Sequence, residues 1–159
     1  MRRREFITLW GSAAAWPIAA MAQQDHVRRL GVLRGANASD PDAQSDVAAF
    51  ESAFRDLGWA LGRNVIIDYR WSGGDAERAR ALAKELLKTS PDAVIAVGTA
   101  AITAFQGQTD TVPIVFARIS DPVGKGFVTN LARPRGNITG FSNFEFAMGG
   151  IWLETLKML

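Results

Sequence analysis

Short apolar runs and longer amphipathic segments alternate along the chain from residue 28 onward. This alternation predicts parallel strands joined by crossover helices. The run at 93–97 is apolar throughout, as expected for a central strand that is covered on both faces. The expected strands are 30–33, 64–69, 93–97 and 112–117, with a short fifth strand at 138–141.

The segments between these strands have helical spacing. The first expected helix ends at Gly58, and its apolar residues Val47, Phe50, Phe54 and Leu57 recur at helical intervals. A second helix is expected at 76–88 with Asp75 as its N-cap, and a shorter one at 100–106. A further helix after the fourth strand is expected to carry Val123, Phe127 and Leu131.

These elements predict an α/β fold, a doubly wound parallel sheet whose ligand-facing loops follow the carboxyl ends of the strands. The loops are 34–42, 71–75, 98–101 and 118–122. The turn Gly98-Thr99-Ala100 leads from a buried strand into a helix without bulky side chains, and free amides at such a turn suit a carboxylate or another electronegative group. Plain helix capping explains the same residues equally well.

The basic charge of the chain is concentrated at its beginning. Of a formal net charge of +2, the excess lies in Arg2, Arg3 and Arg4, which are opposed only by Glu5 in the first 22 residues. The rest of the chain is neutral, so a nucleic-acid-binding role, which needs a basic face, loses its main support. The composition is otherwise that of an ordinary globular domain, and one domain is expected.

Residues 1–22 have the order of a secretory signal sequence, with arginines, an uncharged apolar stretch at 6–20, and Ala20-Met21-Ala22 before polar residues. The stretch is too short and too interrupted to span a bilayer. Arg3-Arg4-Glu5-Phe6-Ile7 resembles a twin-arginine motif, and twin-arginine export is favoured over the general secretory route. Cleavage after Ala22 would release a periplasmic protein that is not embedded in the membrane.

Residues for catalysis or metal binding are scarce. The sequence has no cysteine, and its one histidine, His26, lies in the expected lead-in to the first strand, so transition-metal sites and the usual catalytic triads lack parts. The motifs of nucleotide-binding loops are absent, and no cofactor is predicted. An oxygen-ligated cation site or a carboxylate-based enzyme would have to use Asp40, Asp42 or Asp121, which helix capping and turn formation also explain.

Two tryptophans remain open to more than one interpretation. Trp59 follows the expected helix stop at Gly58 and is expected to close the core. Trp71 lies at a strand exit, where packing at the rim and contact with a ligand are equally consistent with its position.

Several segments resemble a family of bacterial ABC-transporter substrate-binding proteins. The resemblance covers nearly the whole chain, but Arg135 stands where the family pattern has a glycine. It implies a type 1 periplasmic-binding fold, in which a solute lies between two Rossmann-like lobes and is delivered to an ABC permease and ATPase complex. The segments that carry the resemblance are 3–7, 64–71, 113–116, 121–124, 131–134, 136–140 and 142–143.

Members of this family are much longer than this chain, so residues 23–145 are expected to form the N-terminal lobe and residues 146–159 the start of a helix leading to a second lobe. The leading hypothesis is a periplasmic protein that binds a small polar solute, with amino acids among the candidates, and catalyses no reaction. A non-binding truncated product and an exported α/β enzyme of the hydrolase type are the alternatives. The expected solute-binding residues are Ser39, Asp40, Gly98, Thr99, Ala100, Ser120 and Asp121.

Overall fold

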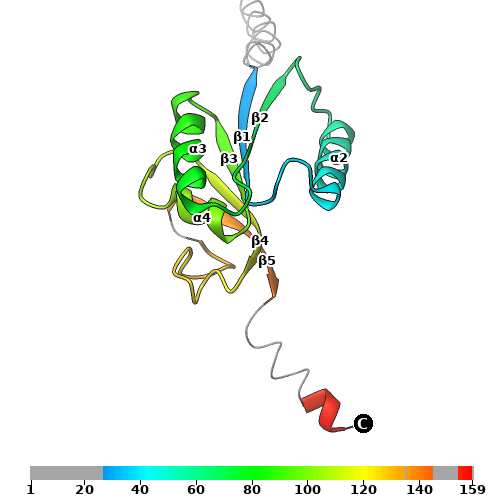
Figure 1. The fold of residues 1–159 in the computed structure, drawn as a ribbon, viewed down its shortest axis with the longest axis vertical. Coiled ribbons are helices and arrows are strands. Elements are labelled where there is room, and N and C mark those ends of the chain that lie inside the picture. The colour runs from blue at the N-terminus through cyan, green and yellow to red at the C-terminus, as the bar shows by residue number, and fades with distance from the viewer. Residues whose placement is uncertain (1–26, 135, 145–153, 159) are drawn as a thin grey trace, which may run out of the picture.

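A five-stranded, all-parallel sheet forms the centre of the molecule. The computed structural model describes residues 27–134, 136–144 and 154–158. The strand order is β2-β1-β3-β4-β5, which confirms the predicted doubly wound α/β fold (Figure 1). The strands are β1 (Arg28–Arg34), β2 (Val65–Trp71), β3 (Ala93–Val97), β4 (Ile114–Ser120) and β5 (Ile138–Phe144).

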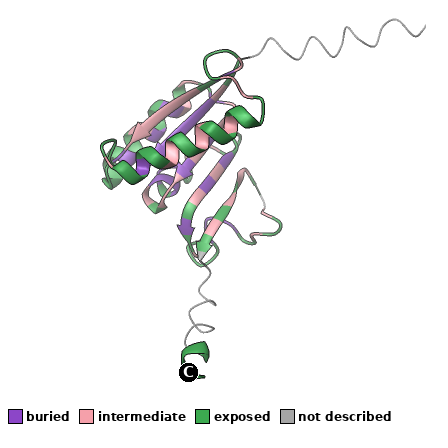
Figure 2. Cartoon of the chain, turned by 90° about the vertical axis from the view of Figure 1, so that its right-hand side faces the viewer, coloured by how far each residue is buried: buried purple, intermediate pink, exposed green. Residues whose placement is uncertain are grey.

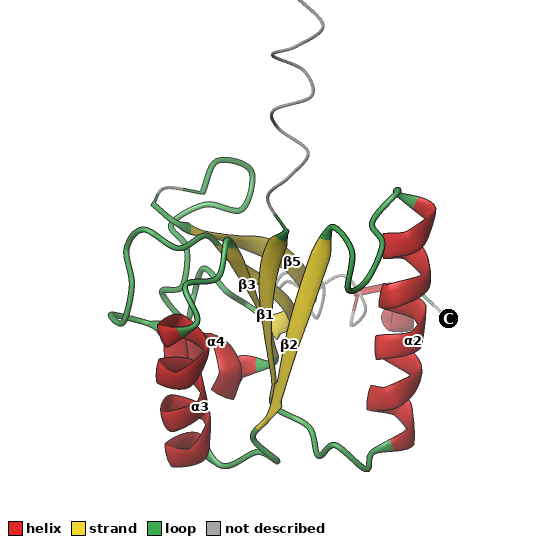
Figure 3. Cartoon of the chain, turned by 90° about the horizontal axis from the view of Figure 1, so that it is seen from above, coloured by secondary structure: helices red, strands yellow, loops and turns green. Residues whose placement is uncertain are grey.

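Helices lie on both faces of the sheet. The helices α3 (Ala76–Lys88) and α4 (Thr99–Phe105) cover one face, and α2 (Pro41–Asp56) lies over the other (Figure 3). The expected helices at 76–88 and 100–106 therefore form close to their predicted bounds. A helical turn also forms at 154–157, within the segment predicted to begin another helix.

The face covered by α3 and α4 contains the larger core. The strand register places Leu33, Ala96 and Phe116 side by side across β1, β3 and β4, and all three are fully buried. Phe105 of α4 is also fully buried in this core. Because side chains alternate between the two faces along a β-strand, the residues next to these in each strand point toward the face under α2.

The face under α2 is less completely buried. Val32 is buried there, but Ile95 beside it is only partly buried. Phe50 and Phe54 of α2 reach toward this face and remain half-buried. Figure 2 shows α2 in front of the sheet, with exposed and intermediate positions along most of its length. Leu57, which was expected on the apolar face of this helix, is 76% exposed because it lies at the C-cap, beyond the sheet-facing turns.

Trp59 stacks on Phe54 with ring centroids 5.7 Å apart. It packs against the core cluster under α2, in agreement with its expected role in closing the core.

The helix expected around Val123, Phe127 and Leu131 does not form. The chain makes a compact series of turns at 122–126, in which the Phe127 amide donates to the Pro122 carbonyl at 2.9 Å. Gly126 has a φ of 72°, a left-handed conformation that ends helical propagation. The apolar spacing nevertheless has a packing function, because Phe127 is buried in the core while Val123 faces solvent.

Among the described residues, no helix has the length and apolar character needed to cross a membrane. The predicted signal sequence at 1–22 lies outside the described residues, as do Ile151, Trp152 and Leu159 of the predicted last helix.

Candidate functional site

The loops after β1 and β3 meet β4 at the carboxyl edge of the sheet, because these three strands are neighbours in the sheet. A polar cavity of about 270 Å³ lies there. Two of the predicted solute-binding residues, Asp40 and Gly98, line it. The complete lining is Arg34, Gly35, Ala36, Asp40, Asp42, Ala43, Val97, Gly98 and Arg118.

Asp40 is the N-cap of α2. Its Oδ1 atom accepts hydrogen bonds from the Asp42 amide at 3.0 Å and the Ala43 amide at 3.4 Å. Pro41 follows at the first helical position, where its missing N–H group leaves no bond unmade. Ser39 lies exposed in the turn before the cap. The cap therefore fixes the position of the loop wall, and it occupies one of the two oxygens of the Asp40 carboxylate.

Gly98 is the N-cap of α4 and has a φ of 92°, a left-handed conformation that favours glycine. Its amide donates to the Ala117 carbonyl at 3.0 Å, so the neighbouring strand already uses this N–H group. Thr99 is exposed and Ala100 half-buried, and their amides lie in the first helical turn, which lacks intrahelical acceptors. The Lys125 Nζ atom lies 3.5 Å from the Thr99 hydroxyl.

Ser120 and Asp121 lie at the end of β4, outside the lining of the polar cavity. The Asp121 Oδ1 atom accepts a hydrogen bond from the Gly124 amide at 2.9 Å. Asp121 itself has a φ of 51°, which aspartate tolerates in such turns. Both Asp40 and Asp121 thus have a capping or turn-forming role in this structure.

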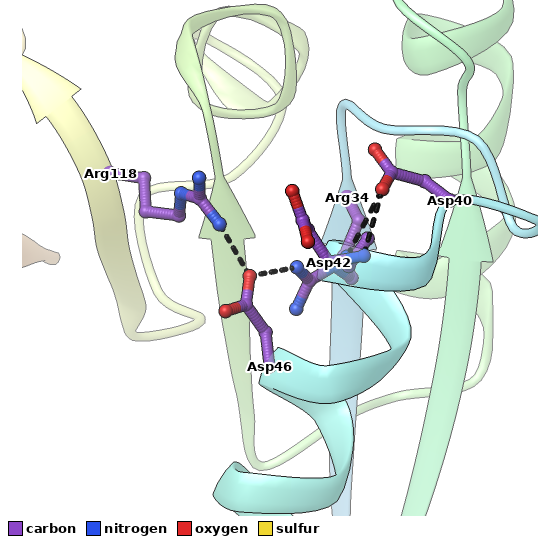
Figure 4. A network of polar contacts seen from close by, with 6 residues as sticks. Arg34, Asp40, Asp42, Asp46 and Arg118 are labelled. Carbon is purple, nitrogen blue, oxygen red and sulfur yellow. Dashed lines mark hydrogen bonds and ion pairs between the residues drawn. The ribbon is translucent and has the colours of Figure 1, made fainter.

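A charged cluster that the sequence reasoning did not identify lies between β1, α2 and β4. The Arg34 Nη2 atom donates to the Asp46 Oδ2 atom at 2.8 Å, and the Arg118 Nη1 atom donates to the same oxygen (Figure 4). The side chain of Arg34 is only 7% exposed, whereas that of Arg118 is 57% exposed. We call these three residues the arginine cluster.

The arginine cluster lowers the pKa of Asp46 below its ordinary value. The main cause is the hydrogen bond from Arg34, and the charge and hydrogen bond of Arg118 act in the same direction, against a smaller effect of burial. Asp46 is therefore a carboxylate at neutral pH, with one oxygen shared by two guanidinium groups.

No sequence pattern joins these three residues, so the arginine cluster was not predicted. Arg34 ends β1 and Arg118 lies within β4, and both fall in the ranges 34–42 and 118–122 that were expected to face a ligand. Asp46 lies outside the apolar stripe of its helix, and α2 turns it toward β1 and β4. Arg118 has a φ of 58°, and the register of β4 with β5 shifts beside it, a local distortion that no sequence pattern announced.

Trp71 and Tyr69 form the wall on the β2 side of the cluster. The Arg34 guanidinium carbon lies 5.2 Å from the Trp71 ring centroid, within the range of a cation–π interaction. The Tyr69 and Trp71 rings stack at 6.5 Å. The Tyr69 hydroxyl donates to Glu51 at 3.1 Å, and burial together with the Glu51 charge raises the pKa of Tyr69. Trp71 therefore packs against Arg34.

An apolar groove of about 320 Å³ lies between α2 and the sheet, next to the polar cavity. Arg34, Arg118 and Val97 line both hollows. Phe141 of β5 borders the groove and is 76% exposed. The carboxyl edge thus offers charged groups beside apolar surface, an arrangement that suits recognition of a small amphipathic molecule.

Among the described residues, no three histidine, cysteine or acidic side chains lie close enough together to hold a metal ion. Of the acidic residues near the site, Asp40 caps α2, Asp121 closes a turn and Asp46 pairs with two arginines.

The chain has clear relatives. A family model described as ABC transporter substrate binding protein matches residues 36–156. The tyrosine-binding protein of Clostridioides difficile (strain R20291) is 28% identical over 104 residues, which cover 65% of this chain and 30% of that protein.

Solved structures have the same fold. The ligand-free, open structure of CD0873, a substrate binding protein with adhesive properties from Clostridium difficile, has a TM-score of 0.70 and 25% identity, covering 82% of this chain and 43% of that one. The ABC domain in complex with L-Trp from Streptococcus pneumonia has a TM-score of 0.65 and 29% identity, covering 72% of this chain and 38% of that one. The chain thus spans less than half the length of these relatives.

Proposed function

The chain belongs to the ABC transporter substrate binding protein family, and from this premise we propose that it binds a small polar solute at the carboxyl edge of its sheet. The observation that carries this proposal is the polar cavity lined by Arg34, Asp40, Gly98 and Arg118, which lies where parallel α/β sheets bind ligands. Binding without turnover is consistent with the relatives, which are binding proteins.

The proposed solute is an amino acid, and an aromatic one is favoured. One relative is a tyrosine-binding protein and another was solved with L-Trp. In this chain the polar cavity supplies charged groups of both signs, and the adjoining apolar groove supplies surface for a ring. The remaining predicted residues, Ser39, Thr99, Ala100, Ser120 and Asp121, stay as proposed contacts around the same edge.

We propose further that residues 23–145 act as one of two lobes that close over the solute. Closure of a second lobe would exclude water and present the loaded protein to a permease and its ATPase. The partly exposed sheet face beside α2 and the exposed Phe141 are consistent with additional covering elements in a complete protein. A lone lobe provides part of the contacts, so we expect the chain alone to bind weakly.

Binding is tested by titrating the ¹⁵N-labelled full chain with L-tryptophan and L-tyrosine. We expect the amides around Asp40, Gly98 and Thr99 to shift, while those at the opposite edge, such as Asn64 and Asp92, stay unchanged. Asp40→Ala should reduce these shifts more than Asp75→Ala, which removes the equivalent cap of α3. Unchanged amides at the carboxyl edge would contradict the proposed function, and a micromolar Kd by calorimetry would contradict the partial site.

Export is tested separately from binding. We propose that residues 1–22 direct the chain to the periplasm and are removed there. The intact mass of the native product in a periplasmic extract, with peptide mapping from Gln23, should show a new N-terminus at that residue. A product that retains Met1 or stays in the cytoplasm would contradict this assignment. A mass well above that of residues 23–159 would move the binding experiments to the longer product.

A further inference from the structure

The arginine cluster has more hydrogen-bond donors than acceptors. A guanidinium group carries five N–H donors, and the two groups here share a single Asp46 oxygen. The Nε atom of Arg34 is buried without a hydrogen-bond partner among the described residues. Within the cluster itself, two positive charges therefore face one negative charge, and the carboxylates of Asp40 and Asp42 belong to the adjoining cavity. The N–H groups of the two guanidinium groups that border the cavity can donate to the carboxylate of a solute.

A solute in the polar cavity can reach part of the two guanidinium groups, and Arg118 is more exposed than Arg34. Both arginines line the polar cavity, whereas Asp46 borders only the apolar groove. Asp46 therefore orients the guanidinium groups without filling the polar cavity. The ring of Trp71 further restrains Arg34, so this cation is pre-positioned at the end of β1.

Asp42 adds a further acidic group to the lining of the same cavity. It belongs to the first turn of α2, where its amide donates to the Asp40 Oδ1 atom, and within the described part of the chain its carboxylate enters no hydrogen bond or ion pair. In the view of Figure 4, the carboxylate of Asp42 is drawn between Arg118 and Asp40. Asp40 is engaged by two backbone amides of the helix cap, so Asp42 is the acidic group better placed to meet a cation.

From this arrangement we propose that the polar cavity recognises the two charges of a zwitterion separately. Arg34 and Arg118 bind the carboxylate, Asp42 binds the ammonium group, and Asp46 positions the two arginines. The inference rests on the proposed function and specifies how that site selects its solute. It predicts the tightest binding for a solute with both charges, and weaker binding for an amine or an acid that carries the same ring.

Three compounds with one ring test this division. L-tryptophan carries both charges, indole-3-propionate carries only the carboxylate, and tryptamine carries only the ammonium group. We expect the wild-type full chain to bind L-tryptophan most tightly in NMR titrations at millimolar concentrations. Arg118→Gln should weaken the binding of L-tryptophan and indole-3-propionate by roughly tenfold, as loss of a charged hydrogen bond would do. It should leave the affinity for tryptamine unchanged.

Asp42→Asn should give the reciprocal result. It should weaken L-tryptophan and tryptamine and leave indole-3-propionate unchanged. Asp46→Asn should weaken the binding of the two compounds that carry a carboxylate, as expected for a positioning residue. Asp68→Asn is the matched control, because it breaks a different ion pair, that of Asp68 with Arg29. A purely structural role would weaken all three compounds alike in each variant.

The outcomes separate the inference from the proposed function. If all three compounds bind the wild type equally, or if Arg118→Gln and Asp42→Asn fail to discriminate among them, the charge assignment is overturned while solute binding stands. If none of the compounds shifts an amide of the cavity in the wild type, the proposed amino-acid function fails in this chain and the inference fails with it.

Discussion

The two faces of the sheet are built from the same strands but are packed very differently. On one face α3 and α4 seal a continuous core in which Leu33, Phe105 and Phe116 are fully buried. On the other, α2 reaches the sheet through half-buried aromatic side chains, and an apolar groove remains beside it. Stability is therefore expected to come mainly from the first face, and ligand recognition from the edge of the second.

The arginine cluster connects the two kinds of surface. It ties α2 to β1 and β4 through Asp46, in addition to the apolar contacts of Phe50 and Phe54. An ion pair holds a helix in place while leaving polar groups accessible, which a sealed hydrophobic core does not. The looser face can thus carry a binding site because its partial packing leaves room for one.

The largest effect is expected from truncating a matched pair of helix aromatics, one on each face. Phe105→Ala should lower the free energy of unfolding by about 3–5 kcal/mol, because a fully buried ring leaves a cavity. Phe50→Ala, in half-buried α2, should cost about half as much or less. Urea unfolding measures both, and equal losses would contradict the difference between the faces.

A smaller effect is expected at Gly140, where β5 approaches β4 closely. A Cβ atom at this position would collide with the backbone oxygen and the ring of Phe116. Gly140→Ala should therefore lower the free energy of unfolding by about 1–3 kcal/mol through displacement of β5. Gly35→Ala is the control, since its Cβ would lie 3.5 Å from the Val97 carbonyl, an ordinary contact. A loss as large in the control would show that added bulk alone explains the effect.

Removing Asp46 tests the looser face. Asp46→Asn leaves Arg34, 7% exposed, without its anionic partner, and we expect a loss of about 1–2 kcal/mol because Asp46 itself is partly solvated. Asp68→Asn should cost less, since its partner Arg29 is 36% exposed. Unfolding in urea measures both variants, and a larger loss in Asp68→Asn would refute the importance assigned to Arg34.

The same pair predicts a pH dependence. The folded pKa of Asp46 is lowered from the ordinary value of 3.8, so its contribution to stability is present above that value and is lost as pH falls through the folded pKa. The difference between wild type and Asp46→Asn should be constant near neutral pH and should shrink below 3.8. A difference that is the same at every pH would contradict a charge-based role.

The smallest effect is expected from the helix caps. Asp75 caps α3 and Asp40 caps α2, and each carboxylate accepts hydrogen bonding from the backbone of the first helical turn. Asp75→Ala should lower global stability by about 1 kcal/mol. Asp40→Ala should mainly accelerate hydrogen exchange within α2, because this helix is the less firmly packed one. Equal losses of global stability, with no faster hydrogen exchange in α2, would contradict the expected difference between the two helices.

Local sequence patterns predicted most of the secondary structure. Alternation and helical spacing are properties of neighbouring residues, so strands such as 93–97 and helices such as 76–88 could be recognised directly. The failed helix near Phe127 shows the limit of this reasoning. Its apolar spacing was real, but Gly126 and the turn closed by Asp121 bend the chain before a helix can propagate.

The candidate site was predictable only in outline. Parallel topology places the loops after Arg34, Val97 and Ser120 at one edge, and Asp40 and Gly98 do line the polar cavity there. The pairing of Asp46 with two arginines was not predicted. Helical periodicity defines which residues share a face, but it does not state what lies opposite that face.

The sequence by itself determined the order of strands and helices along the chain, the parallel sheet and the edge at which ligand-facing loops gather. These features follow from short-range spacing and chain connectivity. Only the tertiary structure decided that Arg34 and Arg118, far apart in the chain, share one oxygen of Asp46. It also decided that one face is sealed and the other partly open. Both features depend on the order of the strands within the sheet, on the distortion of β4 at Arg118 and on the placement of α2. Long-range packing sets all three.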